Sequence, residues 1–522
     1  MTILRAAILA ALFLCTGQNG PAFAEDVTLT SRDGSVEIIG NLLGYDGEFY
    51  RVDSEFGILT IDGSGVLCDG PGCPDLQGYV ADISISGART MGEVLMPALV
   101  QAFGARNGYR VERRVIDDTH FGYTLTDTGN DRIAARIRFR VTSTSEGFAD
   151  LLANEADIVL SSRQASLTEI RLAREIGLGD LADPKRRKII ALDAIVPVVS
   201  AANRFEAVTL DTLAKIFSGE IDNWSALDGP DAAISLHIRD DLSGLTTEFR
   251  RSVLLPAGAK LAASAVRHDS NVDLADAIAR DPYAIGIATQ SEIGNAKPLT
   301  VLGTCGLPAY ANETSLKAEN YPLTTPLFIY TPARRAPLLT REFLRFIRSD
   351  PAQLVIDRAG FVNLRLQELP VSDQGQRLAN SIDYAGEEVS LDDLKRMTKR
   401  MNGTSWVSLV FRFEQGGIKL DAHSQSNVEL LAQMLEQGEY DGRKLVFVGF
   451  SDRAGTATGN LRLAQRRAES VRDAVIQAAS AADRRRVRLE VDAFGEAMPI
   501  ACDESEWGQR INRRVEVWVD QI

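Results

Sequence analysis

Short hydrophobic runs alternate with helix-like patterns along the middle of this chain, between about residues 80 and 369. Three of the runs are short enough to be buried strands: 83–85, 157–160 and 189–199. After the first run, apolar side chains return every three or four positions, which predicts a helix with one buried face: Val94, Leu95, Leu99 and Phe103. Strands alternating with helices indicate an α/β domain in which helices enclose a sheet.

Several of these candidate strands end in hydroxyl-bearing residues and glycines that lead into a helix. The three clearest junctions are Ser86-Gly87, Ser161-Ser162 and Ser243-Gly244. The first turn of a helix exposes backbone N–H groups and the positive end of its dipole, so such junctions favour anion binding. A single acid, Asp193, interrupts the otherwise apolar run at 189–199.

A second pattern lies near the C-terminus. Residues 444–450 alternate as a strand, and a polar loop then leads to a helix that Asn460 can cap. The helix has an apolar stripe: Leu463, Ala464, Ala468, Val471 and Val475. Asp452 is therefore expected at the end of the strand, and Arg467 two turns into the helix. An acid and a guanidinium on one rim suit a ligand end that carries both an ammonium and a carboxylate.

The remaining segments are smaller. Residues 26–68 read as short strands separated by Asp-Gly turns, which predicts a small β module. Ser390 opens a helix that Gly403 can end, so we expect a partly helical connector between the two larger units. The expected organisation is multi-domain, with these boundaries: 1–24 signal peptide, 25–79 β module, 80–369 two-lobed α/β domain, 370–403 connector and 404–522 C-terminal α/β domain.

The first 24 residues predict export. Arg5 precedes an apolar run at 6–14, and Ala22-Phe-Ala24 provides a cleavage site, as in a secretory signal peptide. Cys15 lies inside this run and is expected to be removed with it. No later stretch reaches the ~20 apolar residues of a spanning helix, so we expect a soluble periplasmic protein. The net charge of −14 argues against a nucleic-acid partner.

Signal cleavage would leave four cysteines. Cys68 and Cys73 bracket a Gly- and Pro-containing loop, and we expect them to form a disulfide in an oxidising compartment. Closing so short a loop adds only about 2 kcal/mol. Cys305 and Cys502 belong to different expected domains, so their pairing stays open. None of these cysteines has a histidine at zinc-finger spacing, and we expect no metal.

The C-terminal segment resembles the peptidoglycan-binding domain of the OmpA-like family. The resemblance covers about 120 residues and rests on Asp452, Gly455, Asn460, Arg467 and the run Asn512-Arg-Arg514-Val-Glu-Val517. It implies that the diaminopimelate of the cell-wall peptide is clamped by Asp452 and Arg467, with contributions from Asn460 and Arg514. Ser451 and Ala464 replace the usual Thr and Ser of the family motif, and both charged anchors remain.

The large middle segment resembles the phosphate-binding receptors of ABC importers, a branch of the two-lobed periplasmic binding proteins. The resemblance implies a cleft that holds a dehydrated phosphate through hydroxyls, backbone N–H groups, one Arg and one Asp. The implied contacts are Ser86, Gly87, Thr90, Ser162, Asp193, Arg239, Ser243, Gly244 and Thr246. Leu245 stands where the family has Thr, with Thr246 as a substitute, and Arg89 adds a second positive charge beside the first loop.

Together these patterns predict a non-enzymatic receptor that captures an oxyanion, most simply phosphate, and is held at the peptidoglycan of a Gram-negative envelope. The sequence leaves open whether an inner-membrane ABC transporter or a sensor receives the solute. The alternative is an envelope-organising protein whose receptor-like domain binds a protein partner or another ligand. An enzyme is disfavoured because the four histidines fit no metal motif, and no nucleophile elbow or Walker loop is present. No cofactor is expected.

Overall fold

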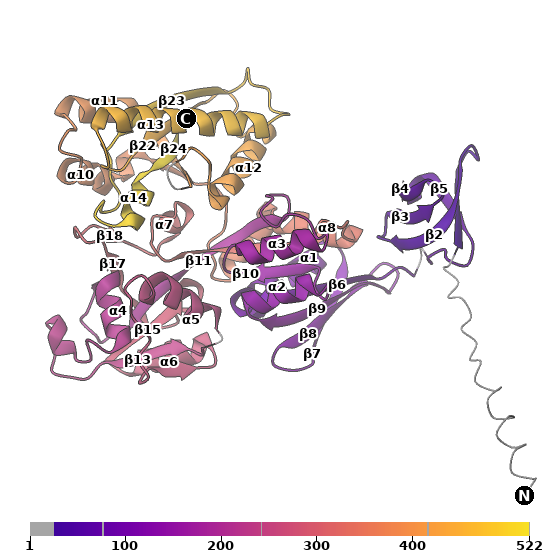
Figure 1. Cartoon of the computed structure of the whole chain (residues 1–522), viewed down its shortest axis with the longest axis horizontal. Helices are drawn as coiled ribbons and strands as arrows, with labels where there is room; N and C mark the ends of the chain where they lie inside the picture. Colours follow the sequence, from indigo (N-terminus) through magenta and orange to yellow (C-terminus); the bar gives the residue numbers. More distant parts are fainter. Residues whose placement is uncertain (1–25, 76–77, 242, 415–416, 521–522) are drawn as a thin grey trace, which may run out of the picture.

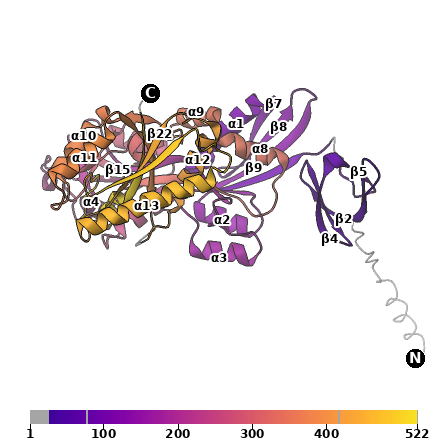
Figure 2. The same cartoon turned by 90° about the horizontal axis from the view of Figure 1, so that it is seen from above.

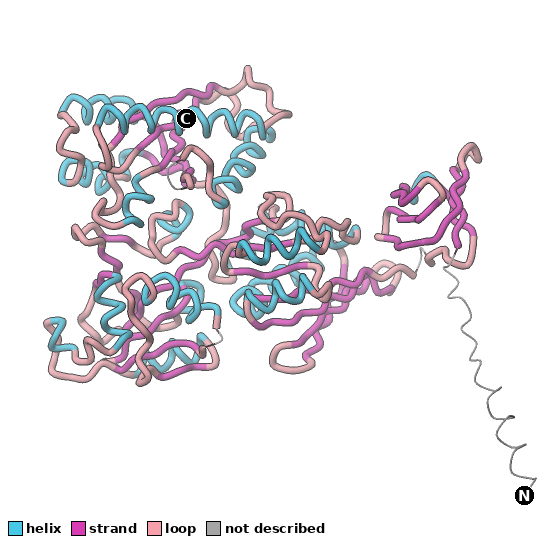
Figure 3. The backbone as a smooth tube through the Cα atoms, viewed as in Figure 1, coloured by secondary structure: helices cyan, strands magenta, loops and turns pink. Residues whose placement is uncertain are grey.

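The computed structural model describes residues 26–75, 78–241, 243–414 and 417–520. The expected signal peptide lies outside these ranges. Figure 3 shows strands enclosed by helices in three units of the molecule, and a fourth, N-terminal unit built almost entirely of strands. The expected multi-domain α/β architecture is confirmed. None of the helices in the described ranges is long and apolar enough to cross a lipid bilayer.

The N-terminal module is a five-stranded antiparallel sheet with strand order β4-β3-β2-β1-β5. Its strands are β1 (Asp26–Ser31), β2 (Glu37–Tyr45), β3 (Phe49–Ser54), β4 (Gly57–Asp62) and β5 (Val66–Asp69). A small core of Val27, Leu29, Tyr50 and Val52 fills it, and the expected Cys68–Cys73 disulfide is present beside that core. Figures 1 and 2 place the module at the end of the molecule far from the C-terminal domain.

Lobe I of the large domain surrounds the sheet β10-β6-β9-β8-β7, with helices on both faces. The strands are β6 (Ala81–Ala88), β7 (Tyr109–Val115), β8 (His120–Asp127), β9 (Arg132–Thr142) and β10 (Ile158–Ser161). The helices are α1 (Met96–Arg106), α2 (Thr144–Leu152), α3 (Leu167–Glu175), α8 (Leu338–Ile347) and α9 (Asp350–Arg358). The apolar stripe foreseen at Leu95, Leu99 and Phe103 is buried here.

Lobe II contains the strands β14, β13 and β15 beside β11, with a second small sheet of β12, β17 and β18. Its strands are β12 (Ala207–Thr209), β13 (Ser235–Arg239), β14 (Val266–His268), β15 (Ala284–Thr289), β16 (Lys297–Pro298), β17 (Thr300–Leu302) and β18 (Pro308–Ala309). Its helices are α4 (Leu210–Ser218), α5 (Gly244–Phe249), α6 (Asn271–Arg280) and α7 (Glu313–Lys317).

Two long strands pass between the lobes: β11 (Arg187–Val199) and β19 (Thr324–Tyr330). β11 pairs with β19 over residues 187–194 and with β15 of lobe II from Ile195 onward. All but one of the thirteen residues of β11 are buried, which explains the long apolar run in the sequence. Asp193 lies where the strand changes partner, at the junction of the lobes.

The C-terminal domain has a sheet of order β20-β21-β24-β22-β23 with helices on both faces. Its strands are β20 (Glu368–Pro370), β21 (Thr404–Arg412), β22 (Lys444–Phe450), β23 (Arg488–Gly495) and β24 (Arg514–Asp520). Its helices are α10 (Gly375–Asp383), α11 (Leu391–Met401), α12 (Ala422–Gln437), α13 (Ala457–Ala478) and α14 (Glu506–Asn512). α12 and α13 cover one face, and the connector helix α11 covers the other.

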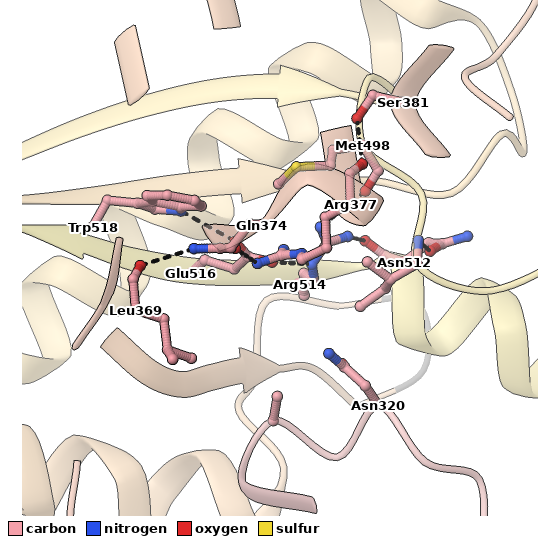
Figure 4. A network of polar contacts seen from close by, with 12 residues as sticks. Asn320, Leu369, Gln374, Arg377, Ser381, Met498, Asn512, Arg514, Glu516 and Trp518 are labelled. Atoms are coloured by element: carbon pink, nitrogen blue, oxygen red, sulfur yellow. Dashed lines mark hydrogen bonds and ion pairs between the residues drawn. The ribbon is translucent and has the colours of Figure 1, made fainter. Parts of the chain in front are cut away.

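A buried charge network fixes the connector to this sheet (Figure 4). Glu516 of β24 accepts a hydrogen bond from Nε of Arg514 at 2.6 Å and pairs with Arg377 of α10. Its other oxygen accepts from the indole N–H of Trp518 at 3.1 Å. Glu516 and Arg514 are completely buried, so each charge depends on these partners. The connector is therefore an integral layer of the C-terminal domain.

The C-terminal domain is also fastened to lobe II. A disulfide joins Cys305 to Cys502, answering the question that the sequence left open. Beside it, Arg412 donates to the carbonyl of Ala318 at 2.8 Å, and Nδ1 of His423 lies 2.8 Å from Oε1 of Glu319. These groups are mostly buried, so the two domains share a dry polar contact.

Candidate functional site

A small cavity of about 30 Å³ lies between the lobes, at the point where β11 crosses. Its polar lining comes from both lobes and from the crossing strand: Arg89, Thr90, Ser162, Asp193, Arg239, Ser243, Gly244, Glu248, Thr289 and Thr325. Six residues that the sequence suggested for an anion site are therefore gathered at one place.

Three of the suggested contacts do not line this cavity, and their role as direct ligands stays a prediction. Ser86 is buried and donates its hydroxyl to Asp150 at 2.5 Å. Gly87 has φ = 135°, and a Cβ there would lie 2.1 Å from the carbonyl oxygen of Leu160, so glycine permits close packing of β6 on β10. Thr246 is fully buried and donates to the carbonyl of Arg239 at 2.9 Å. These residues position their neighbours.

Asp193 is 3% exposed and is held by donors from both sides. Its Oδ1 accepts from the N–H of Ala194 at 2.8 Å and of Ser291 at 3.1 Å, and its Oδ2 accepts from the Ser291 hydroxyl at 2.7 Å. Burial raises the pKa of Asp193 to about 6, although the Ser291 donors act in the opposite direction. Ser291 was missed by sequence reasoning because it is 98 residues away in the chain.

Arg239 ends β13 and is 3% exposed. Its guanidinium donates to the carbonyls of His268 and Asp269 at 3.1 and 2.7 Å, and to Oδ1 of Asn271 at 2.7 Å. It also pairs with Asp240 at 3.3 Å. An arginine has five N–H donors, so lobe II itself engages four of them. Arg239 therefore brings a positive charge to the cleft but few free hydrogen bonds.

Hydroxyl groups complete the cavity wall. Ser243 is the N-cap of α5 and accepts from the N–H of Leu245 at 3.2 Å. The N–H of Ser162 donates to the hydroxyl of Thr144 at 3.1 Å, and the two hydroxyl oxygens are 3.2 Å apart. Leu245 is buried and lines the cavity with an apolar side chain where the resembled family has a hydroxyl. The cleft thus lacks a hydroxyl at position 245, while Thr289 and Thr325 supply hydroxyls that the motif did not include.

The second candidate site lies at the end of β22 in the C-terminal domain. Asp452 is 5% exposed and pairs with Arg513. Asn460, in the first turn of α13, donates to the Asp452 carbonyl at 3.1 Å and to Glu496 at 2.7 Å. The loop after the strand and the start of the helix are therefore held together around Asp452.

Arg467 reaches this site from the middle of α13 and is 2% exposed. It donates to the carbonyl of Gly417 at 3.3 Å and lies over the ring of Phe413 at 5.1 Å. Burial lowers its pKa to about 10, with Arg513 acting in the same direction and Asp452 opposing it. Its buried Nη1 has no partner among the described residues. A buried donor without an acceptor is costly and is suited to a ligand oxygen.

The expectation that Arg514 belongs to this site is wrong. Arg514 is completely buried and donates to the carbonyl of Met498 at 2.9 Å (Figure 4). Its guanidinium lies over the Phe450 ring, 4.2 Å from the ring centroid. Arg514 is the first residue of β24, and its side chain is buried in the domain. Arg513 lies just before the strand, and it is the arginine that pairs with Asp452. The sequence shows two adjacent arginines, but it does not indicate which of them faces the loop that carries Asp452.

Comparison with known families agrees with this division of the molecule. Residues 75–351 match the model described as a PBP superfamily domain, and residues 412–513 match the OmpA family. The chain belongs to the PBP superfamily. It adds a C-terminal OmpA-family domain to that fold, as the sequence resemblance indicated.

Individual relatives fall into the same two groups. The phosphate-binding protein PstS of Borreliella burgdorferi is 23% identical over 237 residues, which cover 44% of this chain and 80% of that protein. The peptidoglycan-associated lipoprotein of Pseudomonas putida is 34% identical over 110 residues, covering 20% of this chain and 60% of the relative. A phosphate transport receptor from Vibrio cholerae aligns structurally with 54% of this chain and 99% of its own, with 20% identity and a TM-score of 0.41.

Proposed function

We propose that this PBP-superfamily protein is a periplasmic receptor for an oxyanion, phosphate being the first candidate, and that its OmpA-family domain holds it at peptidoglycan. The observation that carries the proposal is the convergence of Asp193, Arg239 and the hydroxyls of Thr90, Ser162 and Ser243 on one cavity between two lobes. A ligand that bridges two lobes stabilises their closed arrangement.

The chemistry of the cavity suits a protonated oxyanion. Arg239 supplies positive charge, and Asp193 can accept a hydrogen bond from the P–OH of a monohydrogen or dihydrogen phosphate. Sulfate has no such proton at neutral pH, so its oxygens would face the Asp193 carboxylate and be repelled. The names of the relatives matching this part of the chain, PstS among them, support phosphate as the first anion to test.

The second half of the proposal rests on Asp452, Arg467 and Arg513. Diaminopimelate carries an ammonium and a carboxylate on one carbon, which matches a buried acid beside two guanidiniums. The name of the Pseudomonas putida relative, a peptidoglycan-associated lipoprotein, supports this assignment. The predicted export signal would deliver both sites to the same compartment, where an inner-membrane transporter or a sensor would receive the captured solute.

Two measurements on the purified full-length protein test the two halves separately. A thermal-shift series with phosphate, arsenate, sulfate and nitrate should show stabilisation that grows as RT ln(1 + [L]/Kd) for the bound anion. Co-sedimentation with purified sacculi should deplete the protein from the supernatant. Retention on sacculi with no shift from any anion would favour the alternative, an envelope-organising protein whose receptor-like domain has another ligand or a protein partner.

A further inference from the structure

The cleft contains a second arginine that the lobe itself does not engage. Arg89 directly follows β6 in lobe I and begins the helical segment after it, and it lines the same cavity as Arg239 of lobe II. Its side chain is 36% exposed, and no hydrogen bond joins its guanidinium to another described residue. The carboxylate nearest to it is that of Glu93, one helical turn away at 3.7 Å. This distance is long for a charge-assisted hydrogen bond.

The two arginines therefore differ in how many donors they can offer. Lobe II engages four of the five N–H groups of Arg239, as described above. Arg89 retains its donors and has only a loose ion pair to hold it. The remaining charged group on the cavity wall, Glu248, is already paired with Arg251 and accepts from the Ser252 hydroxyl at 2.7 Å. Arg89 is thus the lining cation best able to change partner.

Glu93 is close to both guanidiniums. Burial raises its pKa, while Arg89 and Arg239 both act to lower it and Glu292 acts to raise it. A carboxylate near two arginines from opposite lobes has the electrostatic environment that an oxyanion would need. Glu93 is consequently an internal counter-ion that competes with a bound anion for Arg89.

We propose that Arg89 is a specificity-determining residue of the anion site, which leaves Glu93 and closes lobe I on the ligand through charge-assisted hydrogen bonds. This inference rests on the proposed function and refines its ligand class. With Arg89 and Arg239 on opposite sides, the cleft takes a doubly charged tetrahedral oxyanion. Arg89 also compensates for Leu245, which removes a hydroxyl from the lobe II wall. The anion then bridges the two lobes through one guanidinium from each.

The test is calorimetric titration of phosphate into the full-length protein and four variants at pH 7.5. Arg89→Ala should weaken binding about tenfold or more, because a charge-assisted bond to the ligand is lost. Arg89→Lys should recover part of the affinity, since it keeps the charge. Glu93→Gln should bind more tightly than wild type, because it removes the competing carboxylate. Arg171→Ala is the matched control, since Arg171 is an exposed arginine on α3 of the same lobe, and it should bind as wild type.

The Glu93→Gln measurement distinguishes a ligand contact of Arg89 from a purely structural role. If the Arg89–Glu93 ion pair only stabilised the fold, both Arg89→Ala and Glu93→Gln would bind phosphate more weakly than wild type. If wild type binds phosphate and the phosphate affinity of Arg89→Ala lies within twofold of it, the role assigned to Arg89 is overturned while the proposed function stands. Absence of binding by wild type to phosphate, arsenate and sulfate would instead overturn the proposed function, and this inference with it.

Discussion

Cys305 of lobe II and Cys502 of the C-terminal domain form a disulfide although 197 residues separate them in the chain. The bond adjoins the contact of Arg412 and His423 with residues 318–320, so covalent and polar links fix the same pair of domains. A further ion pair, Lys188 to Glu429 at 2.7 Å, connects the C-terminal domain to the start of β11. The C-terminal domain therefore contacts the strand that crosses between the lobes.

We expect removal of this disulfide to loosen the domains. On the chain-entropy account, a crosslink closing so long a loop contributes up to about 5 kcal/mol. The double variant Cys305→Ser/Cys502→Ser should unfold at a lower temperature in calorimetry and show separate transitions for the large and C-terminal domains. Cys68→Ser/Cys73→Ser is the matched control, because its loop is short and confined to the N-terminal module. Equal melting profiles for wild type and Cys305→Ser/Cys502→Ser would show that the polar contacts alone hold the domains.

The proposed peptidoglycan site predicts that substitutions of two adjacent arginines, Arg513 and Arg514, have different effects. Arg513→Gln, Asp452→Asn and Arg467→Gln should remain folded and lose co-sedimentation with sacculi, because each removes a charge that faces the ligand. Arg514→Gln should instead destabilise the domain by roughly 3 kcal/mol, since it leaves Glu516 with one buried partner fewer. Circular dichroism and denaturant titration measure the second effect, and sedimentation measures the first.

Arg462→Gln is the control for the clamp series, because Arg462 is exposed on the same helix. It should sediment with sacculi as wild type does. Full sedimentation of a folded Asp452→Asn protein would remove Asp452 from the wall site.

In the anion cleft, Arg239→Ala should weaken phosphate binding by about tenfold or more, because it removes a buried positive charge. Asp193→Asn should change the selectivity for phosphate over sulfate more than the affinity for phosphate, since the amide no longer repels sulfate. Calorimetric titration of both anions into both variants checks this pair. Unchanged phosphate affinity in Arg239→Ala, or an unchanged sulfate-to-phosphate ratio in Asp193→Asn, would contradict the assigned roles.

The raised pKa of Asp193 also predicts a pH dependence of stability. Because the pKa rises from its usual 3.8 to about 6 in the folded protein, ionisation disfavours the native state. The contribution of the neutral carboxyl is complete below pH 3.8 and is lost as pH rises through 6. Asp193→Asn should therefore gain stability relative to wild type between pH 4.5 and 7.5, by up to roughly 3 kcal/mol.

Urea unfolding of the large domain at pH 4.5 and at pH 7.5 measures this gain in the free energy of unfolding. Ser291→Ala provides a second variant, because it keeps the carboxyl but removes one of its donors, the Ser291 hydroxyl, and its stability should fall more steeply with pH than that of wild type. If the stability advantage of Asp193→Asn over wild type became smaller as pH rises, that result would contradict the raised pKa of Asp193.

The sequence by itself determined the local elements and the two families. The long apolar run with a single acid became β11, because a strand buried on both faces needs apolar side chains almost throughout. The strand, loop and helix around Asp452 and Arg467 were legible because hydrogen bonds within a short segment and period-specific apolar stripes decide them. The cap was not, since Thr456 caps this helix and the expected Asn460 lies in its first turn. The turn-rich start likewise indicated a β module.

Tertiary structure alone decided which of these residues meet. The sequence could not separate Arg513 from Arg514, because the folded arrangement of α14, β24 and the loop after β22 sets which arginine meets Asp452. It could not pair Ser291 with Asp193 or Cys305 with Cys502, since contacts between distant segments depend on how lobes and domains pack. Nor could it show that Ser86 and Thr246 turn away from the cleft while Arg89 keeps its donors free. Those outcomes depend on competition among buried polar partners, which exists only once the chain has folded.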